Sequence, residues 1–255
     1  GEFLNQKLFL MTSVGFVSLC LVASMVYIIN DIVDIEKDRN HPTKCRRPLA
    51  SGSVSIKQAI ITCVFLLLFV ISMLIFTKNY IKIGIILLVY FILNIAYSLK
   101  LKNMPIIDVS IIVLCFFIRV LLGSVVTGIE ISGWLFLTVI SGSFFLALGK
   151  RRNELEQNSG KDTRVALKYY TYEFLDKNMY MCIALTNVFY SLWAVENSEY
   201  TMWTIPLLIV ICMKYSLDIE GDSEGDPTEV IFHDKLLILL GLIFAFALFV
   251  TLYVA

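Results

Sequence analysis

The sequence is poor in charge and carries no net charge. Only 16% of its 255 residues are charged, and 21 lysines and arginines balance 21 aspartates and glutamates. Without a basic excess there is no general attraction to nucleic acid, which argues against a nucleic-acid-binding protein. The six cysteines have neither CxxC spacing nor the cysteine–histidine spacing of a metal site, and five lie in apolar runs. They indicate packing residues.

Apolar residues make up 58% of the chain, and the mean hydropathy is +0.80. A soluble domain of this length exposes part of its surface to water and does not need so many apolar residues. Apolar runs of membrane-spanning length recur, and in lipid each satisfies its backbone as a helix. We therefore predict an all-α integral membrane protein, a multi-span transmembrane helical bundle that forms one domain over residues 1–255. The eight predicted spans are 8–29, 57–76, 81–98, 107–127, 133–149, 179–195, 202–217 and 236–254.

The long polar segments are predicted to lie on one face of the membrane. Because successive spans alternate in direction, the segments after the first, third, fifth and seventh spans emerge on the same side. These segments are 30–56, 99–106, 150–178 and 218–235. All lysines and arginines lie on or at the edge of this face, except Lys7, Lys78, Lys82 and Arg119. The positive-inside rule therefore predicts that the face is cytoplasmic.

Acidic residues gather on the same face, where the positive-inside rule does not require them. The only exceptions are Glu2, Glu130, Glu196 and Glu199. One interpretation is a solvated surface of salt bridges, and the other is a site for a cation together with a polyanion. The spacing of the acids after the first span favours the second interpretation.

The segment from Asn30 to Asp38 has the sequence N-D-I-V-D-I-E-K-D, without glycine or proline. If the helix continues, Asn30, Asp34 and Asp38 follow one another at i, i+4 and i+8, and Asp31 lies one i+3 step from Asp34. Like charges on one stripe repel each other, and a divalent cation removes this repulsion. Oxygen ligands without histidine or cysteine favour magnesium, which keeps water and is completed by substrate phosphates. We predict all four residues as magnesium ligands.

The next segment is basic and irregular. Residues 42–52 have the sequence P-T-K-C-R-R-P-L-A-S-G, in which the prolines and the glycine end the helix. Lys44, Arg46 and Arg47 are then within reach of an anion held through the metal. Arginine can bind phosphate oxygens two at a time, and lysine acts as a point charge. The two segments together predict a site for magnesium-bound pyrophosphate.

The N-D-x-x-D-x-x-x-D pattern from Asn30, followed by R-P-L-A-S-G from Arg47, resembles the first aspartate-rich motif of the UbiA-type intramembrane prenyltransferase superfamily. The resemblance implies a UbiA-like bundle of nine spans in the complete protein, with acidic motifs after spans two and six. It implies that one N-terminal span precedes Gly1, which places residues 150–178 at the second motif. The aspartate pair of that motif is replaced here by K-R-R-N-E-L-E at residues 150–156.

Further segments resemble the phosphoribosyltransferase branch of this superfamily. They are Y-S-L-K at 97–100, N-M-P-I-I-D at 103–108, Ile118-Arg119, Y-E-F-L-D at 172–176 and D-P-T-E-V at 226–230. Members of the branch transfer 5-phosphoribose from phosphoribosyl pyrophosphate to a polyprenyl (decaprenyl) phosphate, for cell-wall arabinan. The resemblance therefore implies a magnesium-dependent membrane enzyme of the bacterial cytoplasmic membrane, with its active site on the cytoplasmic face.

That reaction brings several phosphates together, so one magnesium ion needs additional cations around it. With the resemblance, this implies that Asp31, Asp34, Asp38 and Lys44 are catalytic. The substrate-binding residues implied in the same way are Asn30, Lys44, Arg46, Arg47, Lys100, Lys102, Arg119, Lys150, Arg151, Arg152, Glu154 and Tyr172. The implied partners are phosphoribosyl pyrophosphate, the polyprenyl phosphate lipid and the membrane, and a homo-oligomer is compatible with the sequence.

Several residues have a structural interpretation as well. Arg119 is costly inside an apolar span, so it pairs with a carboxylate or contacts a substrate phosphate. Asp108 caps a helix or contacts substrate or metal. Tyr169, Tyr170 and Tyr172 are interfacial anchors, or, for Tyr172, a substrate-binding residue as the resemblance implies. The acids of residues 218–226 form a solvated loop or a second metal site.

Two other functions remain open. A UbiA-type prenyltransferase would use a prenyl diphosphate with an aromatic or other acceptor. A transporter is the alternative from a different class, because buried charge in a helical bundle also marks ion paths. The gathering of acids at one face, without a clear inverted repeat, argues against a transporter.

Overall fold

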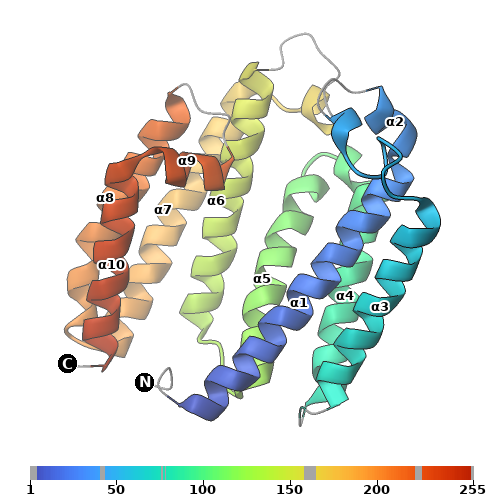
Figure 1. The fold of residues 1–255 in the computed structure, drawn as a ribbon. Helices are drawn as coiled ribbons and strands as arrows, with labels where there is room; N and C mark the ends of the chain where they lie inside the picture. Colours follow the sequence, from blue (N-terminus) through green and yellow to red (C-terminus); the bar gives the residue numbers. More distant parts are fainter. Residues whose placement is uncertain are drawn as a thin grey trace. The chain divides into compact units, whose positions relative to one another are not determined.

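The computed structural model describes residues 5–40, 44–75, 77, 79–157, 165–221 and 226–253. This part of the chain consists of helices and their connections and contains no strand (Figure 1). Large apolar side chains point outward from the long helices, among them Phe65 and Phe246, which are 68% and 70% exposed. Such surfaces are stable in lipid, where backbone groups pair within each helix. The predicted all-α membrane fold is confirmed.

The chain divides into two compact units, and α5 (Ile107–Thr127) contributes to both. One unit extends to Lys100 and adds Ile118–Glu130. Its other helices are α1 (Gln6–Val33), the short α2 (Ile35–Arg39), the 3-10 turn η1 (Lys44–Arg46), α3 (Ile56–Ile75) and α4 (Tyr80–Leu99). Figure 1 shows α1 beside α3 and α4. Gly15 permits a close approach of α1 to α5, because a Cβ there would lie 2.9 Å from Cγ2 of Val126.

The other unit comprises Leu101–Phe117 and the part of the chain from Ile131 onward. Its elements are η2 (Leu101–Asn103), the first half of α5, α6 (Gly133–Gln157), η3 (Val165–Tyr169), α7 (Tyr172–Asn197), η4 (Thr201–Thr204), α8 (Ile205–Glu220), α9 (Pro227–His233) and α10 (Lys235–Tyr253). The long helices α6 and α7 pack along each other. Leu175, Met179 and Ile219 are fully buried. Gly149, which directly precedes the charged end of α6, packs closely against this core, because a Cβ there would lie 2.9 Å from Cδ1 of Ile219.

Within the described residues, seven helices are long and apolar enough to cross a membrane: α1, α3, α4, α5, α6, α10, and α8 together with η4. The predicted span 179–195 lies within the 26-residue α7, which carries polar residues such as Asn187 and is not among the seven. The predicted count of eight is therefore not confirmed. Phe76 and Val254, at which two predicted spans end, lie outside the described residues.

One predicted boundary is wrong. The segment from Lys150 is predicted as a loop, but α6 continues without interruption to Gln157. Beyond Ile29, where the first predicted span ends, α1 continues to Val33, in agreement with the predicted continuation of the helix into the acidic motif. Lysine, arginine, glutamate, leucine and glutamine all favour helix, so a run of charge at the membrane surface does not by itself end one. The charged residues 150–156 are consequently held on a rigid helix.

Candidate active site

The acidic motif lies where α1 passes into α2. α1 ends at Val33, Asp34 adopts a turn with φ −96° and ψ 11°, and α2 begins at Ile35. The predicted single helix is therefore interrupted at one residue. The i to i+4 hydrogen bonds continue across the turn, since the Asp34 N–H donates to the Asn30 carbonyl at 2.9 Å and the Asp38 N–H donates to the Asp34 carbonyl at 2.8 Å. The spacing along the stripe is thus nearly that of a helix.

Arg47 connects the two ends of this stripe. Its Nη1 donates to Oδ1 of Asp31 at 2.8 Å and to Oδ2 of Asp38 at 2.9 Å. The side chain of Asp38 is 7% exposed and that of Asp31 is 27% exposed, whereas that of Arg47 is 43% exposed. Two carboxylates from different helices therefore converge on one positively charged nitrogen at the edge of the unit.

The loop after α2 places Arg47 in this position. Leu49 and Ala50 are buried and attach the loop to the unit. The backbone turns tightly after Arg47, and the Ser51 N–H donates to the Arg47 carbonyl at 2.8 Å. The next residue, Gly52, has φ +80°, a region that favours glycine. Nε of Arg39 donates to the Ala50 carbonyl at 3.3 Å, which ties the loop to α2. The backbone of Arg47 is therefore held from both sides.

The remaining predicted residues of this segment are more exposed. Oδ1 of Asp34 accepts a hydrogen bond from Lys37 at 3.3 Å, and the Lys37 side chain is 82% exposed. Lys44 and Arg46 are exposed on η1. The structure thus brings Asp31, Asp38 and Arg47 together, and leaves Lys44 and Arg46 beside them on the surface.

The donor chemistry of the motif fits a hard divalent cation. Carboxylate and amide oxygens are magnesium ligands, and the two carboxylates that meet at Arg47 already share one cation. Among the described residues, no group of three or more acidic, histidine or cysteine side chains is arranged to hold a metal ion. Water and substrate phosphates would therefore have to supply the remaining ligands, as is usual for magnesium.

In the other unit, three consecutive basic residues near the end of α6 pair with carboxylates from three other elements. Lys150 pairs with Asp226 before α9 at 2.5 Å, Arg151 with Asp108 on α5 at 2.7 Å, and Arg152 with Asp176 on α7 at 3.1 Å. Consecutive residues of a helix point about 100° apart, so one short segment can reach three neighbours. The basic residues predicted to bind phosphate also fasten this unit together.

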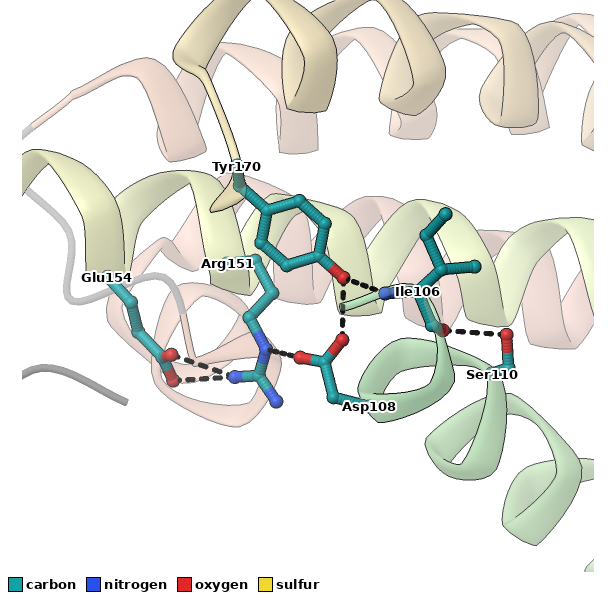
Figure 2. Close-up of polar contacts among 6 residues, drawn as sticks. All are labelled: Ile106, Asp108, Ser110, Arg151, Glu154 and Tyr170. Carbon is teal, nitrogen blue, oxygen red and sulfur yellow. Dashed lines mark hydrogen bonds and ion pairs between the residues drawn. The ribbon is translucent and has the colours of Figure 1, made fainter. Parts of the chain in front are cut away.

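The Arg151 pair is the buried centre of a larger network (Figure 2). The side chain of Arg151 is 1% exposed and that of Asp108 is 0% exposed. Figure 2 shows that Arg151 also donates from Nη1 to both oxygens of Glu154, at 2.8 and 2.9 Å. Each buried charge therefore has an opposite charge and hydrogen bonds. Asp108 was predicted to cap a helix or to contact substrate or metal. The structure shows a different role, a buried ion pair with Arg151.

Tyr170 completes the network from the segment before α7. Its hydroxyl donates to Oδ1 of Asp108 at 2.6 Å and accepts from the Ile106 N–H at 2.5 Å. Tyr170 is 6% exposed, so it packs inside the unit rather than serving as an interfacial anchor. Burial and the hydrogen bond to Asp108 raise the pKa of its hydroxyl. Ile106 has φ +68°, which is unfavourable for a β-branched residue, and its hydrogen bond to Tyr170 helps to hold it there.

Tyr170→Phe is expected to lower the free energy of unfolding by about 1–3 kcal/mol, because it removes one partner of the buried Asp108 carboxylate and the acceptor of the Ile106 N–H. SDS titration of the purified protein in mixed micelles measures the change. Tyr169→Phe is the matched control, since Tyr169 is 70% exposed. Equal stability of both variants would contradict a stabilising role for the Tyr170 hydroxyl.

Arg152 and Tyr172 also lie together. The Arg152 guanidinium donates to the Tyr172 hydroxyl and lies over the tyrosine ring, with its carbon 4.5 Å from the ring centroid. Nη1 of Arg152 is buried and has no hydrogen-bond partner within the described residues. Such a donor is rare in a folded protein and can be satisfied by a ligand or by water. Arg152 therefore keeps a donor that the buried network around Arg151 does not use.

Lys150 and Asp226 form a more open pair. The hydrogen bond from Lys150, followed by that from the Thr228 hydroxyl, lowers the pKa of Asp226 to about 2. Asp218 and Asp234 both pair with Lys214. The acids of residues 218–226 that the structure describes are thus partly paired with lysines, and Asp222 and Glu224 lie outside the described residues.

Asp226→Asn is expected to lower the thermal midpoint at neutral pH. The folded pKa of Asp226 lies below its ordinary 3.8, so the ionised carboxylate stabilises the folded state above about pH 4 and this contribution disappears as the pH falls toward about 2. The difference between wild type and variant should therefore shrink over that window in melting curves recorded by differential scanning fluorimetry. A difference that is independent of pH would contradict the ion pair. Glu229→Gln on α9 is the control, because no ion pair of Glu229 is seen among the described residues.

Arg119 lies in the membrane-spanning part of the first unit. Nη2 donates to the Tyr90 hydroxyl at 3.4 Å, and the guanidinium carbon lies 5.9 Å from the centroid of that ring. Both residues line a cavity of about 350 Å³ between α1, α4 and α5, whose other walls are mostly apolar. Lys100 follows α4 in this unit, whereas Lys102 lies on η2 of the other unit.

The comparisons with known proteins agree with these features. Residues 1–236 match the sequence model of the UbiA prenyltransferase family. The chain is 31% identical to decaprenyl-phosphate phosphoribosyltransferase of Corynebacterium glutamicum, over 98% of this chain and 78% of the relative. It is 35% identical to the protein of the same name from Mycolicibacterium smegmatis, over 88% of this chain and 75% of the relative.

Solved structures are similar in fold. A UbiA homologue from Archaeoglobus fulgidus bound to GPP and Mg²⁺ has a TM-score of 0.70 with 18% identity, over 95% of this chain and 87% of that one. The same homologue bound to DMAPP and Mg²⁺ also has a TM-score of 0.70. At this identity the likeness concerns the fold.

Proposed function

Because the chain belongs to the UbiA prenyltransferase family, we propose that it transfers 5-phosphoribose from phosphoribosyl pyrophosphate to a polyprenyl phosphate and releases pyrophosphate. The observation that carries the proposal is the acidic motif closed by Arg47, in a chain that is 31–35% identical over most of its length to phosphoribosyltransferases. The product would supply arabinan precursors of a bacterial cell wall, from an active site on the cytoplasmic face.

The proposed reaction needs positive charge more than it needs a base. The bond between C1 of the ribose and the pyrophosphate breaks, and the pyrophosphate leaves with the electron pair. An oxygen of the lipid phosphate forms the new bond to C1 from the opposite side. This oxygen is already anionic, so no proton has to be removed. What the protein must supply is neutralisation of the charge that develops on the leaving group.

We propose that Asn30, Asp31, Asp34 and Asp38 hold a magnesium ion. When bound, magnesium would supply charge neutralisation and orientation for the donor's pyrophosphate. Lys44 and Arg46 are exposed beside the motif and would bind phosphate oxygens directly. Lys44 belongs with the three aspartates as a catalytic residue, because it would stabilise the leaving group.

The remaining predicted residues are proposed to bind substrate, each in a different way. Arg152 has a buried donor without a described partner, and Tyr172 orients its guanidinium. Arg151 acts through its fixed pairing with Asp108 and holds the Glu154 carboxylate. Arg119 and the apolar cavity around it would receive part of the lipid. The proposed substrate-binding set also includes Lys100, Lys102 and Lys150.

The decisive experiment supplies purified protein with radiolabelled phosphoribosyl pyrophosphate, decaprenyl phosphate and magnesium. Label should move into the lipid fraction as lipid-linked ribose phosphate, with one pyrophosphate released per transfer, and EDTA should prevent this. A parallel reaction contains geranyl diphosphate and 4-hydroxybenzoate, as a test of the alternative prenyltransferase. Prenyl transfer without ribose transfer would replace the proposal, and flux of solute into vesicles without chemical conversion would favour a transporter.

A further inference from the structure

We infer that Arg47 is a built-in substitute for the divalent cation. Before metal binding, its guanidinium neutralises Asp31 and Asp38. When the motif is loaded with metal, the guanidinium leaves both carboxylates and binds the pyrophosphate of the donor. This inference rests on the proposed function, because it takes the magnesium site of the acidic motif as its starting point.

Asp38 is a buried carboxylate. The residue is 5% exposed, and its carboxylate accepts from Nη1 of Arg47 at 2.9 Å. An ionised carboxylate withdrawn from water is strongly destabilising unless a cation pairs with it. The space between Asp31 and Asp38 therefore needs a positive charge whether or not a metal is bound. Arg47 supplies that charge in this structure.

Arginine and magnesium cannot bind these carboxylate oxygens at the same distance. Magnesium binds carboxylate oxygens at about 2.0–2.1 Å. Nη1 of Arg47 lies farther away, at 2.8 Å from the Asp31 oxygen and 2.9 Å from the Asp38 oxygen. Two positive centres in one small site also repel each other. Metal binding at the two oxygens that Arg47 contacts, Oδ1 of Asp31 and Oδ2 of Asp38, therefore requires the guanidinium to move.

Only the side chain of Arg47 has to move for this exchange. The Arg47 side chain is 43% exposed, so it has an open side. Its backbone is held by the turn to Ser51 and by the burial of Leu49 and Ala50. The guanidinium can thus turn away while remaining tethered beside the motif, where the pyrophosphate would lie.

Arg151 provides the contrast within the same chain. It also bridges two carboxylates, Asp108 and Glu154, but its side chain is 1% exposed. Moving it would leave the fully buried Asp108 without a cation. Of these two arginines that join a carboxylate pair, one is accessible and exchangeable, and the other is permanent.

The test measures metal affinity in the absence of substrate. Mn²⁺ is the probe, and free Mn²⁺ is followed by electron paramagnetic resonance during titration of the purified full chain. Arg47→Gln should bind Mn²⁺ about tenfold more tightly than wild type, because a competing cation has been removed. Its melting temperature should be lower than that of wild type without metal, and saturating Mn²⁺ should restore it.

Two variants serve as controls. Arg47→Lys keeps a competing charge and should bind Mn²⁺ within threefold of the wild type. Lys57→Gln removes an exposed lysine near the start of α3 in the same unit, and should leave the affinity unchanged. If Arg47→Gln does not fold without metal, it is purified in Mn²⁺ and its affinity is measured by competition with a chelator.

The outcomes separate this inference from the proposed function. Mn²⁺ affinity that is equal or weaker in Arg47→Gln, with normal binding to wild type, overturns the exchange and leaves the metal site in place. A loss of melting temperature that Mn²⁺ does not restore overturns it as well, because Arg47 would then be a structural residue only. If neither protein binds Mn²⁺, the metal site and the exchange both fail.

Discussion

Asp31→Asn should lower the rate of phosphoribosyl transfer on the order of 10³-fold while the protein still folds. The change removes one of the two carboxylates that converge on Arg47, and with it a proposed metal ligand, but it keeps the size of the side chain. The Asp31 side chain is 27% exposed, so the loss of its charge leaves no large buried imbalance. Initial rates with labelled phosphoribosyl pyrophosphate, measured over a range of magnesium concentrations, test the expectation.

The matched control is Glu36→Gln on α2, five residues along the same segment. Glu36 is exposed and lies outside the stripe, so its charge should matter little for transfer. Circular dichroism and the elution profile of each variant confirm that the helices are intact. Near-normal turnover of Asp31→Asn, or an equal loss in Glu36→Gln, would refute the assignment of the acidic motif.

Arg151→Met has the largest expected effect on stability, a loss of about 3–5 kcal/mol in the free energy of unfolding. Methionine fills the space of the arginine stem but leaves the carboxylate of Asp108, which is 0% exposed, without its cation. The hydrogen bond from Tyr170 alone does not replace a full charge. SDS titration in mixed micelles measures the unfolding free energy.

The double variant Asp108→Leu with Arg151→Met distinguishes an unpaired charge from lost packing. With both charges removed, most of the stability should return, since an apolar pair can replace a buried ion pair at little cost. Lys177→Gln is a further control, because Lys177 and Glu173 form an exposed pair at 3.3 Å whose loss should cost less than about 1 kcal/mol. A double variant as unstable as Arg151→Met would contradict the charge-based explanation.

The acidic motif could be predicted because its information is local. Helical spacing alone places Asp31, Asp34 and Asp38 near one another, and the one-residue turn at Asp34 changes this only slightly. The position of Arg47 over the motif depends instead on the tertiary fold of the loop. The buried Leu49 and Ala50 and the turn at Gly52 bring it back over α2. The basic segment that follows the motif predicted a cation beside it, but not the contact with two carboxylates.

The network around Arg151 could not be predicted, because its members are distant in sequence. Asp108 lies 43 residues from Arg151 and 62 residues from Tyr170. In sequence, an aspartate at a helix start suggests a cap, and tyrosines beside a span suggest anchors. The sequence does contain two signals: an acid at the start of a predicted span and three adjacent basic residues. Nothing in the sequence itself pairs residues that lie so far apart.

The three adjacent basic residues of α6 pair with carboxylates in three directions, so the rotation of this helix about its axis decides whether the unit is held together. Inserting one alanine between Phe145 and Gly149 would rotate Lys150, Arg151 and Arg152 by about 100° and misdirect all three at once, although every charge would still be present. α5, α7 and α9 would lose their connections to α6 together. In this unit, the number of residues between the apolar core and the charged end of α6 therefore matters as much as the identity of the charges.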